Sequence, residues 1–181
     1  MPSTLATRIP AGTWTADKVH STVGFAVKHN VVSTFRGAFA DFEAQLVSGE
    51  DGSLRLEGRV PVDSIVVKDE NLVAHLKSPE FFDVERHPDI TFTSTLVRAE
   101  GDALVVDGDL TVKGRTRPIE GRGSLTEPTE TPWGTNVIAV ELEAVVDRTE
   151  YGLNWNAPLP KGGFVLANDV KLHVNLELVK S

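Results

Sequence analysis

A strict alternation of residue types from Ser21 to His29 constrains this chain more than any other feature of its sequence. Valine or phenylalanine occupies every second position from Val23 to Val27, and small or polar residues stand between them. A period of two predicts a β-strand with one apolar face. Because Ser21 and His29 put polar groups at both ends of that face, the strand suits the wall of a cavity with a polar mouth. It also suits a core strand whose polar ends are hydrogen-bonded.

The same alternation recurs through most of the chain and predicts an all-β protein. Short polar turns such as SGEDGS at 48–53 join the apolar runs, so neighbouring strands should be antiparallel. A sheet of about eight or nine strands usually closes to remove its edges. We therefore predict an eight-stranded antiparallel, lipocalin-like β-barrel, which is wide enough to hold one small ligand. The predicted strands span residues 13–19, 21–29, 35–47, 54–63, 89–96, 104–112, 119–125, 138–146 and 170–178.

One segment changes period and predicts a helix. In KDENLVAHLK at 68–77, the apolar residues Leu72, Val73 and Leu76 share a helical face, and Asp69 is a suitable N-cap. Ser78-Pro79-Glu80 repeats a helix-start signal and predicts a second helical turn that carries Phe81 and Phe82. We expect residues 69–82 to form a short helical lid or insertion on the barrel.

The totals of the sequence limit the remaining possibilities. We expect a flexible N-terminal arm at 1–12 and a single barrel domain at 13–181. There is no apolar run of signal-peptide or membrane-span length, so we expect a cytoplasmic protein without a transmembrane segment. A formal net charge of −8 argues against nucleic acid as a partner. The absence of cysteine excludes disulfides and thiolate chemistry.

Small residues on the inward faces favour a cavity over a filled core. A tightly packed interior would place leucine or isoleucine at several of these positions. The positions that we expect to leave volume are Gly58, Gly108, Gly121, Gly123 and Ala144.

The polar residues give little support for a metal site or an enzyme. The five histidines, His20, His29, His75, His87 and His173, match no compact ligand spacing, so we predict no metal and no cofactor. Asp17 with His20, and Asp147 with Glu150, are acid–base candidates, yet turns of barrels carry such pairs routinely. Ser21 follows His20 directly, and neighbouring strand residues face opposite ways, so they do not form a nucleophile–base pair.

Several basic residues are candidates for binding a ligand head group. The run KGRTR at 113–117, with Lys77, Arg86 and Lys161, could receive a diphosphate or carboxylate at the mouth of the barrel. The alternative is a solvated turn with basic side chains, and both interpretations stay open at this point.

Five motifs resemble those of the YceI-like polyisoprenoid-binding proteins. They occur in that family's order and cover nearly all of the chain from residue 14 onward: WTADKVHSTVGFAVKH (14–29), FRGAF (35–39), HLKSPEFFDVERHPDITFTS (75–94), GDLTVKGRTRPI (108–119) and DRTEYGLNW (147–155). The resemblance implies a lipocalin-like barrel with a helical cover that holds a long isoprenoid or similar lipid chain.

From the resemblance and the pattern we expect non-catalytic binding, storage or transport of an amphipathic lipid with a long isoprenoid-like chain. One alternative is an enzyme or stress-response protein acting on a small lipid or quinone, with His29 as acid or base. Another is a filled barrel that serves as an interaction module. Flat outer faces are also compatible with a homodimer. The residues expected to bind the ligand are Val23, Phe25, Val27, His29, Leu56, Val60, Leu76, Phe81, Phe82, Phe92, Leu110, Leu142 and Leu176.

Overall fold

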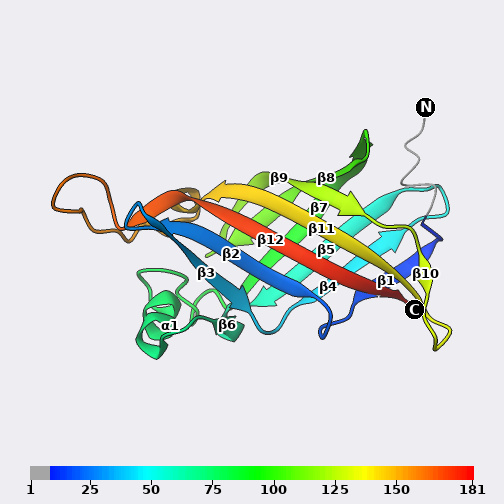
Figure 1. Cartoon of the computed structure of the whole chain (residues 1–181), viewed down its shortest axis with the longest axis horizontal. Helices are drawn as coiled ribbons and strands as arrows, with labels where there is room; N and C mark the ends of the chain where they lie inside the picture. Colours follow the sequence, from blue (N-terminus) through cyan, green and yellow to red (C-terminus); the bar gives the residue numbers. More distant parts are fainter. Residues whose placement is uncertain (1–8) are drawn as a thin grey trace.

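A computed structural model describes residues 9–181 of the chain and contains twelve β-strands, one α-helix and two short 3₁₀ turns (Figure 1). The helix α1 spans Glu70–Lys77, and the 3₁₀ turns η2 and η3 span Val62–Ser64 and Arg148–Tyr151. The strands are β1 (Gly12–Ala16), β2 (Thr22–His29), β3 (Ser33–Phe39), β4 (Glu43–Ser48), β5 (Leu54–Pro61), β6 (Ile65–Val66), β7 (Asp89–Glu100), β8 (Ala103–Val112), β9 (Arg115–Leu125), β10 (Thr129–Glu130), β11 (Asn136–Asp147) and β12 (Leu166–Lys180).

The strands form one antiparallel sheet that closes into an eight-stranded barrel, as the sequence predicted. Pairing of β11 with β12, from Val137 opposite Val179 to Asp147 opposite Asp169, completes the ring. Three positions in the ring are each built from two consecutive strands, β1 with β2, β3 with β4, and β5 with β6, while β10 only extends the edge of β11. Closure pairs the long strands on both sides and so satisfies their backbone groups.

The prediction of one continuous strand over 35–47 was wrong. The chain leaves the sheet after Phe39 and returns at Glu43. Phe39 and Phe42 are both buried, although they lie three positions apart and a single strand would turn them to opposite faces. The break lets both aromatic rings face the interior. Residues 17–21 make a similar break between β1 and β2.

A β-bulge corrects the predicted face of β7. The register shifts by one residue between Ser94, which pairs with Gly108, and Leu96, which pairs with Asp107. An extra residue in one strand reverses the faces beyond it. Uninterrupted alternation over the predicted strand 89–96 would place Leu96 on the same face as Phe92, but after the bulge Leu96 is 54% exposed.

One end of the barrel is filled by side chains. A cluster of buried residues around Trp14, Ile138 and Leu178 packs there, and all three are at most 1% exposed. Ile9, inside the predicted arm 1–12, is buried in this cluster, while residues 1–8 lie outside the described part of the chain. The division into arm and domain stays a prediction.

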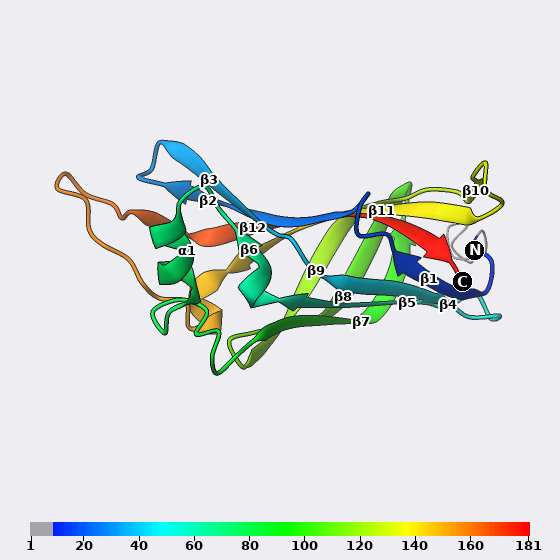
Figure 2. The same ribbon diagram turned by 90° about the horizontal axis from the view of Figure 1, so that it is seen from below.

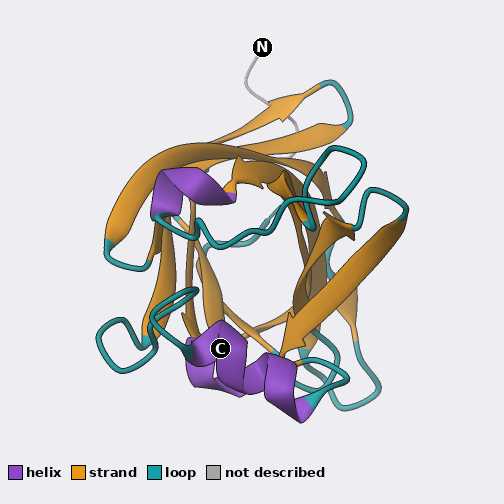
Figure 3. Cartoon of the chain, turned by 90° about the vertical axis from the view of Figure 1, so that its left-hand side faces the viewer, coloured by secondary structure: helices purple, strands orange, loops and turns teal. Residues whose placement is uncertain are grey.

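The opposite end carries α1 and the loops that precede and follow the long strands (Figure 2). Asp69 caps the helix as predicted, because its carboxylate accepts a hydrogen bond from the backbone N–H of Leu72 at 3.0 Å. Residues 78–83 form hydrogen-bonded turns rather than the second helical turn that the Ser-Pro-Glu signal predicted. The Ser78 hydroxyl bonds backward to the carbonyl of His75 at 2.6 Å, so it closes α1 instead of starting another helix. Figure 3 views the barrel from this end.

Two of the glycines expected to leave volume do not do so. Phe92 lies across Gly108, and a Cβ there would overlap the phenyl ring. At Gly123 a Cβ would overlap the backbone carbonyl of Glu141 on β11, so this glycine allows a close approach of two strands. Space remains at Gly121, where the nearest neighbour of a Cβ is 3.8 Å away.

This difference predicts that the same substitution has a large effect at Gly123 and a small one at Gly121, two residues away on β9. We expect Gly123→Ala to lower the free energy of unfolding by about 2 kcal/mol, because the backbone of β9 or β11 has to shift. Gly121→Ala should change it by less than about 0.5 kcal/mol. Urea unfolding of both variants measures this, and equal losses would contradict the assigned strand contact.

Candidate ligand-binding cavity

A cavity of about 370 Å³ occupies the half of the barrel that carries α1, and its wall is almost entirely apolar. This volume lies in the range of small-molecule sites, roughly 300–1,000 Å³. Its presence contradicts the filled-barrel alternative for this half of the molecule. The cavity ends where Phe42, Val106 and Leu176 join the packed cluster at the other end.

All thirteen residues that the sequence analysis selected lie on the wall of this cavity. They come from six strands, from α1 and from the turn after it, and alternation along each strand turns the strand residues inward. Their role as ligand contacts stays a prediction. The thirteen are Val23, Phe25, Val27 and His29 of β2, Leu56 and Val60 of β5, Leu76 of α1, Phe81 and Phe82 after it, Phe92 of β7, Leu110 of β8, Leu142 of β11 and Leu176 of β12.

Aromatic rings of β2 and β3 form one side of the wall. The ring centroid of Phe25 lies 6.2 Å from that of Phe35 and 5.9 Å from that of Phe39. Gly37, opposite Phe25 in the neighbouring strand, has no side chain, and this lets the Phe25 ring lie over the sheet. A Cβ at this position would overlap the ring, so any larger residue would require the Phe25 side chain to move.

A second aromatic group closes the cavity beneath α1. The imidazole of His75 makes edge contacts with Phe81 and Trp155, at centroid distances of 4.9 and 5.1 Å. His75 also bonds the Glu80 carboxylate through Nε2 at 2.5 Å. The helix, the turn after it and the loop after η3 are therefore joined by ring contacts at one point.

Several wall residues escaped the sequence analysis. Phe35 and Phe39 were obscured by the assumption of one long strand, and Trp155 lies in a loop, where no period marks an inward face. The alternation of β12 could have identified Leu172 and Val174, which share a face with Leu176. Further residues of the cavity wall that were not selected include Ile90, Val106, Val112, Ile119, Val146, Tyr151, Leu153, Val165, Leu166 and Val170.

Arg148 is a buried cation at the edge of the cavity and fastens the loop that follows η3. Its guanidinium donates to the carbonyls of Ala167 at 2.8 Å, Leu153 at 2.5 Å and Trp155 at 2.9 Å, with a longer contact of 3.5 Å to Leu166. Burial lowers its pKa from the usual guanidinium range. The sequence analysis assigned this residue no role.

Tyr151 is almost fully buried beside Arg148 and lines the cavity. Its hydroxyl has no hydrogen-bond partner among the described residues. Burial, followed by the nearby Glu150 carboxylate, raises the pKa of the phenol to about 12, so the group stays protonated at neutral pH. It is therefore a hydrogen-bond donor and not a base.

The basic residues proposed for a head group do not gather at the cavity. Lys77 pairs with Asp63 at 2.9 Å and Arg86 lies 3.9 Å from Asp83. Lys113 donates to the backbone carbonyl of Pro79 at 2.9 Å and so ties the turn after α1 to the barrel. Residues 113–117, Lys77 and Arg86 do not line the cavity, which favours their interpretation as basic side chains of turns over a head-group site.

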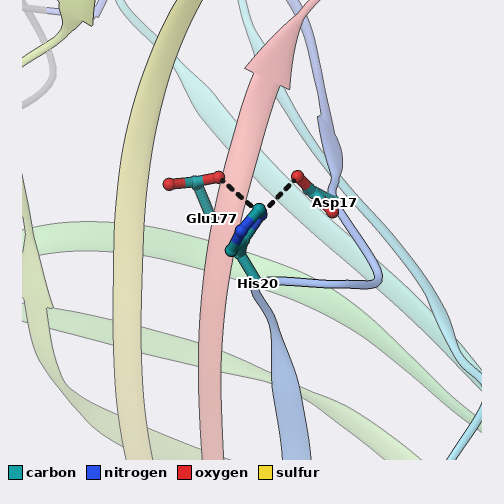
Figure 4. A group of neighbouring side chains, drawn as sticks. All are labelled: Asp17, His20 and Glu177. Atoms are coloured by element: carbon teal, nitrogen blue, oxygen red, sulfur yellow. Dashed lines mark hydrogen bonds and ion pairs between the residues drawn. The ribbon is translucent and has the colours of Figure 1, made fainter. Parts of the chain in front are cut away.

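A polar cluster on the outer surface joins Asp17, His20 and Glu177 (Figure 4). Nδ1 of His20 lies 2.8 Å from the Asp17 carboxylate and 3.5 Å from that of Glu177. The sequence analysis paired Asp17 with His20 and missed Glu177, which β12 brings in from a distant part of the chain. None of the three lines the cavity, and His20 is exposed. The cluster holds the break between β1 and β2 against β12.

The cluster predicts a pH-dependent contribution to stability. The hydrogen bond with Asp17 raises the pKa of His20 and lowers the pKa of Asp17. The contribution of His20 is complete below its unfolded pKa and is lost as pH rises through the higher folded value; that of Asp17 is lost as pH falls. We expect His20→Gln to reduce the free energy of unfolding more at about pH 5 than at about pH 9. Urea unfolding at both values tests this, and a loss independent of pH would count against the ion pair.

The other histidines are dispersed. His29 lines the cavity at one end of β2, and His173 faces outward on β12, 4.0 Å from Glu141. His87 packs against Gly114 in the turn between β8 and β9.

Within residues 9–181, no helix combines the length and apolar character needed to cross a bilayer.

Comparison by sequence gives one family match and close relatives. Residues 14–178 match the family model described as the YceI-like domain. A UPF0312 protein of Staphylococcus aureus (strain USA300) is 32% identical over 170 residues, which cover 91% of this chain and 95% of that protein.

Comparison by structure identifies barrels of the same fold. BcnA of Burkholderia cenocepacia superposes with a TM-score of 0.75 at 20% identity, covering 92% of this chain and 99% of that one. A polyisoprenoid binding domain from Saccharophagus degradans has a TM-score of 0.66 at 11% identity, with coverages of 95% and 100%. At these identities, the likeness shows a common barrel fold.

Proposed function

Since this chain belongs to the YceI-like family, we propose that it binds an amphipathic lipid with a long isoprenoid-like chain inside the barrel, for storage or transport and without chemical turnover. The observation that carries the proposal is the apolar cavity of about 370 Å³. A structural neighbour is described as a polyisoprenoid binding domain, which agrees with this ligand class.

The energetics of such a wall favour a hydrocarbon chain. Each methylene buried from water contributes roughly 0.8 kcal/mol. A chain of about a dozen carbons therefore offers on the order of 10 kcal/mol before the cost of association is subtracted. Apolar contact alone is sufficient for binding, and no catalytic group is needed.

The positions of the two acid–base pairs that were considered as catalytic candidates favour binding without turnover. Asp17 and His20 lie outside the cavity, and the Asp147 carboxylate accepts bonds from the N–H and hydroxyl of Thr149. His29 reaches the wall and is the group that an enzyme acting on a small lipid or quinone would use. A cytoplasmic location and a homodimer stay predictions.

Titration with geranylgeraniol, a short isoprenoid alcohol, tests the proposal. Trp155 on the cavity wall reports binding through its emission, and a Trp133→Phe background removes the signal of the 86% exposed Trp133. We expect saturable binding that shifts the emission to shorter wavelength. An unchanged spectrum, together with no uptake of the alcohol after gel filtration, would overturn the proposal.

A further inference from the structure

Two loops project together from the end of the barrel that carries α1. We call residues 30–32, between β2 and β3, and residues 157–165, before β12, the tip (Figure 1). The backbone N–H of Asn30 donates to the carbonyl of Val165 at 2.7 Å. A side chain at Gly163 would touch Val31, so the two loops are also in contact at their ends.

The tip exposes large apolar side chains to water. Val32 is 84% exposed, Val31 65% and Phe164 58%. Val31 has a φ of 68°, a left-handed backbone conformation that a β-branched residue rarely adopts. Glycine is the favoured residue in such a turn, so the chain holds an apolar side chain at a position where it strains the backbone.

The charge of this region is opposite to that of the whole chain. Residues 28–36 and 156–168 contain Lys28, Arg36 and Lys161 and no aspartate or glutamate, whereas the full chain has a formal net charge of −8. No carboxylate among residues 9–181 lies within ion-pair distance of these three cations. The local positive charge of these two ranges favours contact with an anionic surface.

The tip is continuous with the cavity. Leu166 lines the cavity and also the shallow groove that Lys28, Val31 and Phe164 form at the surface. His29, which pairs with Leu166 across β2 and β12, lies on the cavity wall directly before the tip. A lipid that leaves a surface in contact with the tip has only a short distance to travel.

We propose that the tip docks on an anionic lipid bilayer, with Val31, Val32 and Phe164 entering the interface and the three cations contacting phosphate groups. Apolar side chains beside lysine and arginine are the combination that binds such interfaces. The purpose of docking, the exchange of a lipid with the cavity, rests on the proposed function. The docking itself depends only on the surface of the tip.

Sedimentation with vesicles tests the docking. The probe is vesicles of phosphatidylcholine with about one third phosphatidylglycerol, compared with phosphatidylcholine alone. We expect the wild-type protein to bind the anionic vesicles and release them at high salt. The double variant Val32→Ser/Phe164→Ser should bind on the order of tenfold more weakly, and Lys28→Gln/Lys161→Gln should lose affinity to a similar degree.

A matched control distinguishes the tip from exposed apolar surface in general. Val19→Ser/Trp133→Ser removes two side chains that are 84% and 86% exposed in other loops, and binding should stay within about twofold of wild type. Failure of the wild-type protein to bind anionic vesicles, or equal binding by the tip and control variants, would overturn docking. Self-association abolished by the tip variant, without vesicle binding, would assign the surface to a second copy of the chain.

The two proposals fail in different ways. Geranylgeraniol delivered from solvent, without vesicles, should fill the cavity of the tip variant as it fills that of the wild type. Loss of this uptake in the wild type would overturn the lipid-binding function while leaving the vesicle result as evidence on the tip. Normal uptake with no vesicle binding would overturn only the docking.

Discussion

Arg148→Met is expected to lower the free energy of unfolding by about 3 kcal/mol, a large fraction of the stability of a typical domain. Methionine fills much of the volume of the arginine stem but donates no hydrogen bond. The buried carbonyl of Leu153 and the partly buried carbonyls of Trp155 and Ala167 would then lose their donor. Removing the arginine charge also removes the free-energy cost of burying it. This gain offsets only part of the stability lost with the hydrogen bonds.

Arg148→Lys is the matched control. It keeps the charge but lacks the planar group that reaches several carbonyls at once. We expect a loss intermediate between wild type and Arg148→Met, measured by urea unfolding. Near-equal stability of all three proteins would contradict the assigned role of Arg148 in fastening the loop. Hydrogen exchange should rise first in residues 153–157 of the methionine variant.

The sequence predicted the barrel and the position of the wall because both follow from alternation. In β2 and β8, every second residue faces inward over the whole strand, so counting by two was sufficient. The same counting failed at 40–42 and at the bulge before Leu96. There one or more residues leave the ladder, and every later face reverses. The switch from odd-numbered Phe39 to even-numbered Phe42 was a signal of the first break.

Contacts between residues far apart in the chain could not be predicted from the sequence pattern. Nothing local indicates that Glu177 joins Asp17 and His20, or that Arg148 bonds carbonyls of two separate segments. Gly108 and Gly121 look alike in the sequence, yet Phe92 covers Gly108, whereas a Cβ at Gly121 would meet its neighbours only at an ordinary contact distance of 3.8 Å. Such distinctions depend on which strand lies opposite, and the closure of the barrel decides that.

Phe25→Asp is expected to abolish binding of an isoprenoid alcohol, with a loss of affinity of at least about a hundredfold. Phe25 lies on the cavity wall between Phe35 and Phe39. A carboxylate there would lie among aromatic rings, and burying it under a hydrocarbon chain costs several kcal/mol, of which about 2.7 kcal/mol already corresponds to a hundredfold. Titration with geranylgeraniol and Trp155 emission measures the effect.

Two controls make this result specific to the cavity. Phe25→Leu keeps the wall apolar and should retain affinity within about fivefold. Thr22→Asp puts the same charge on the exposed face of the same strand and should bind as wild type does. Circular dichroism establishes that each variant is folded. Normal binding by folded Phe25→Asp would move the ligand site elsewhere in the molecule.

Mass spectrometry of the purified protein, under native conditions and again after organic extraction, tests whether the barrel holds an isoprenoid lipid. We expect a bound species of at least a few hundred daltons whose fragments or homologues differ by isoprene units, released by extraction and retained by the wild-type protein but not by Phe25→Asp. An empty protein that also takes up no added polyprenyl lipid would contradict it.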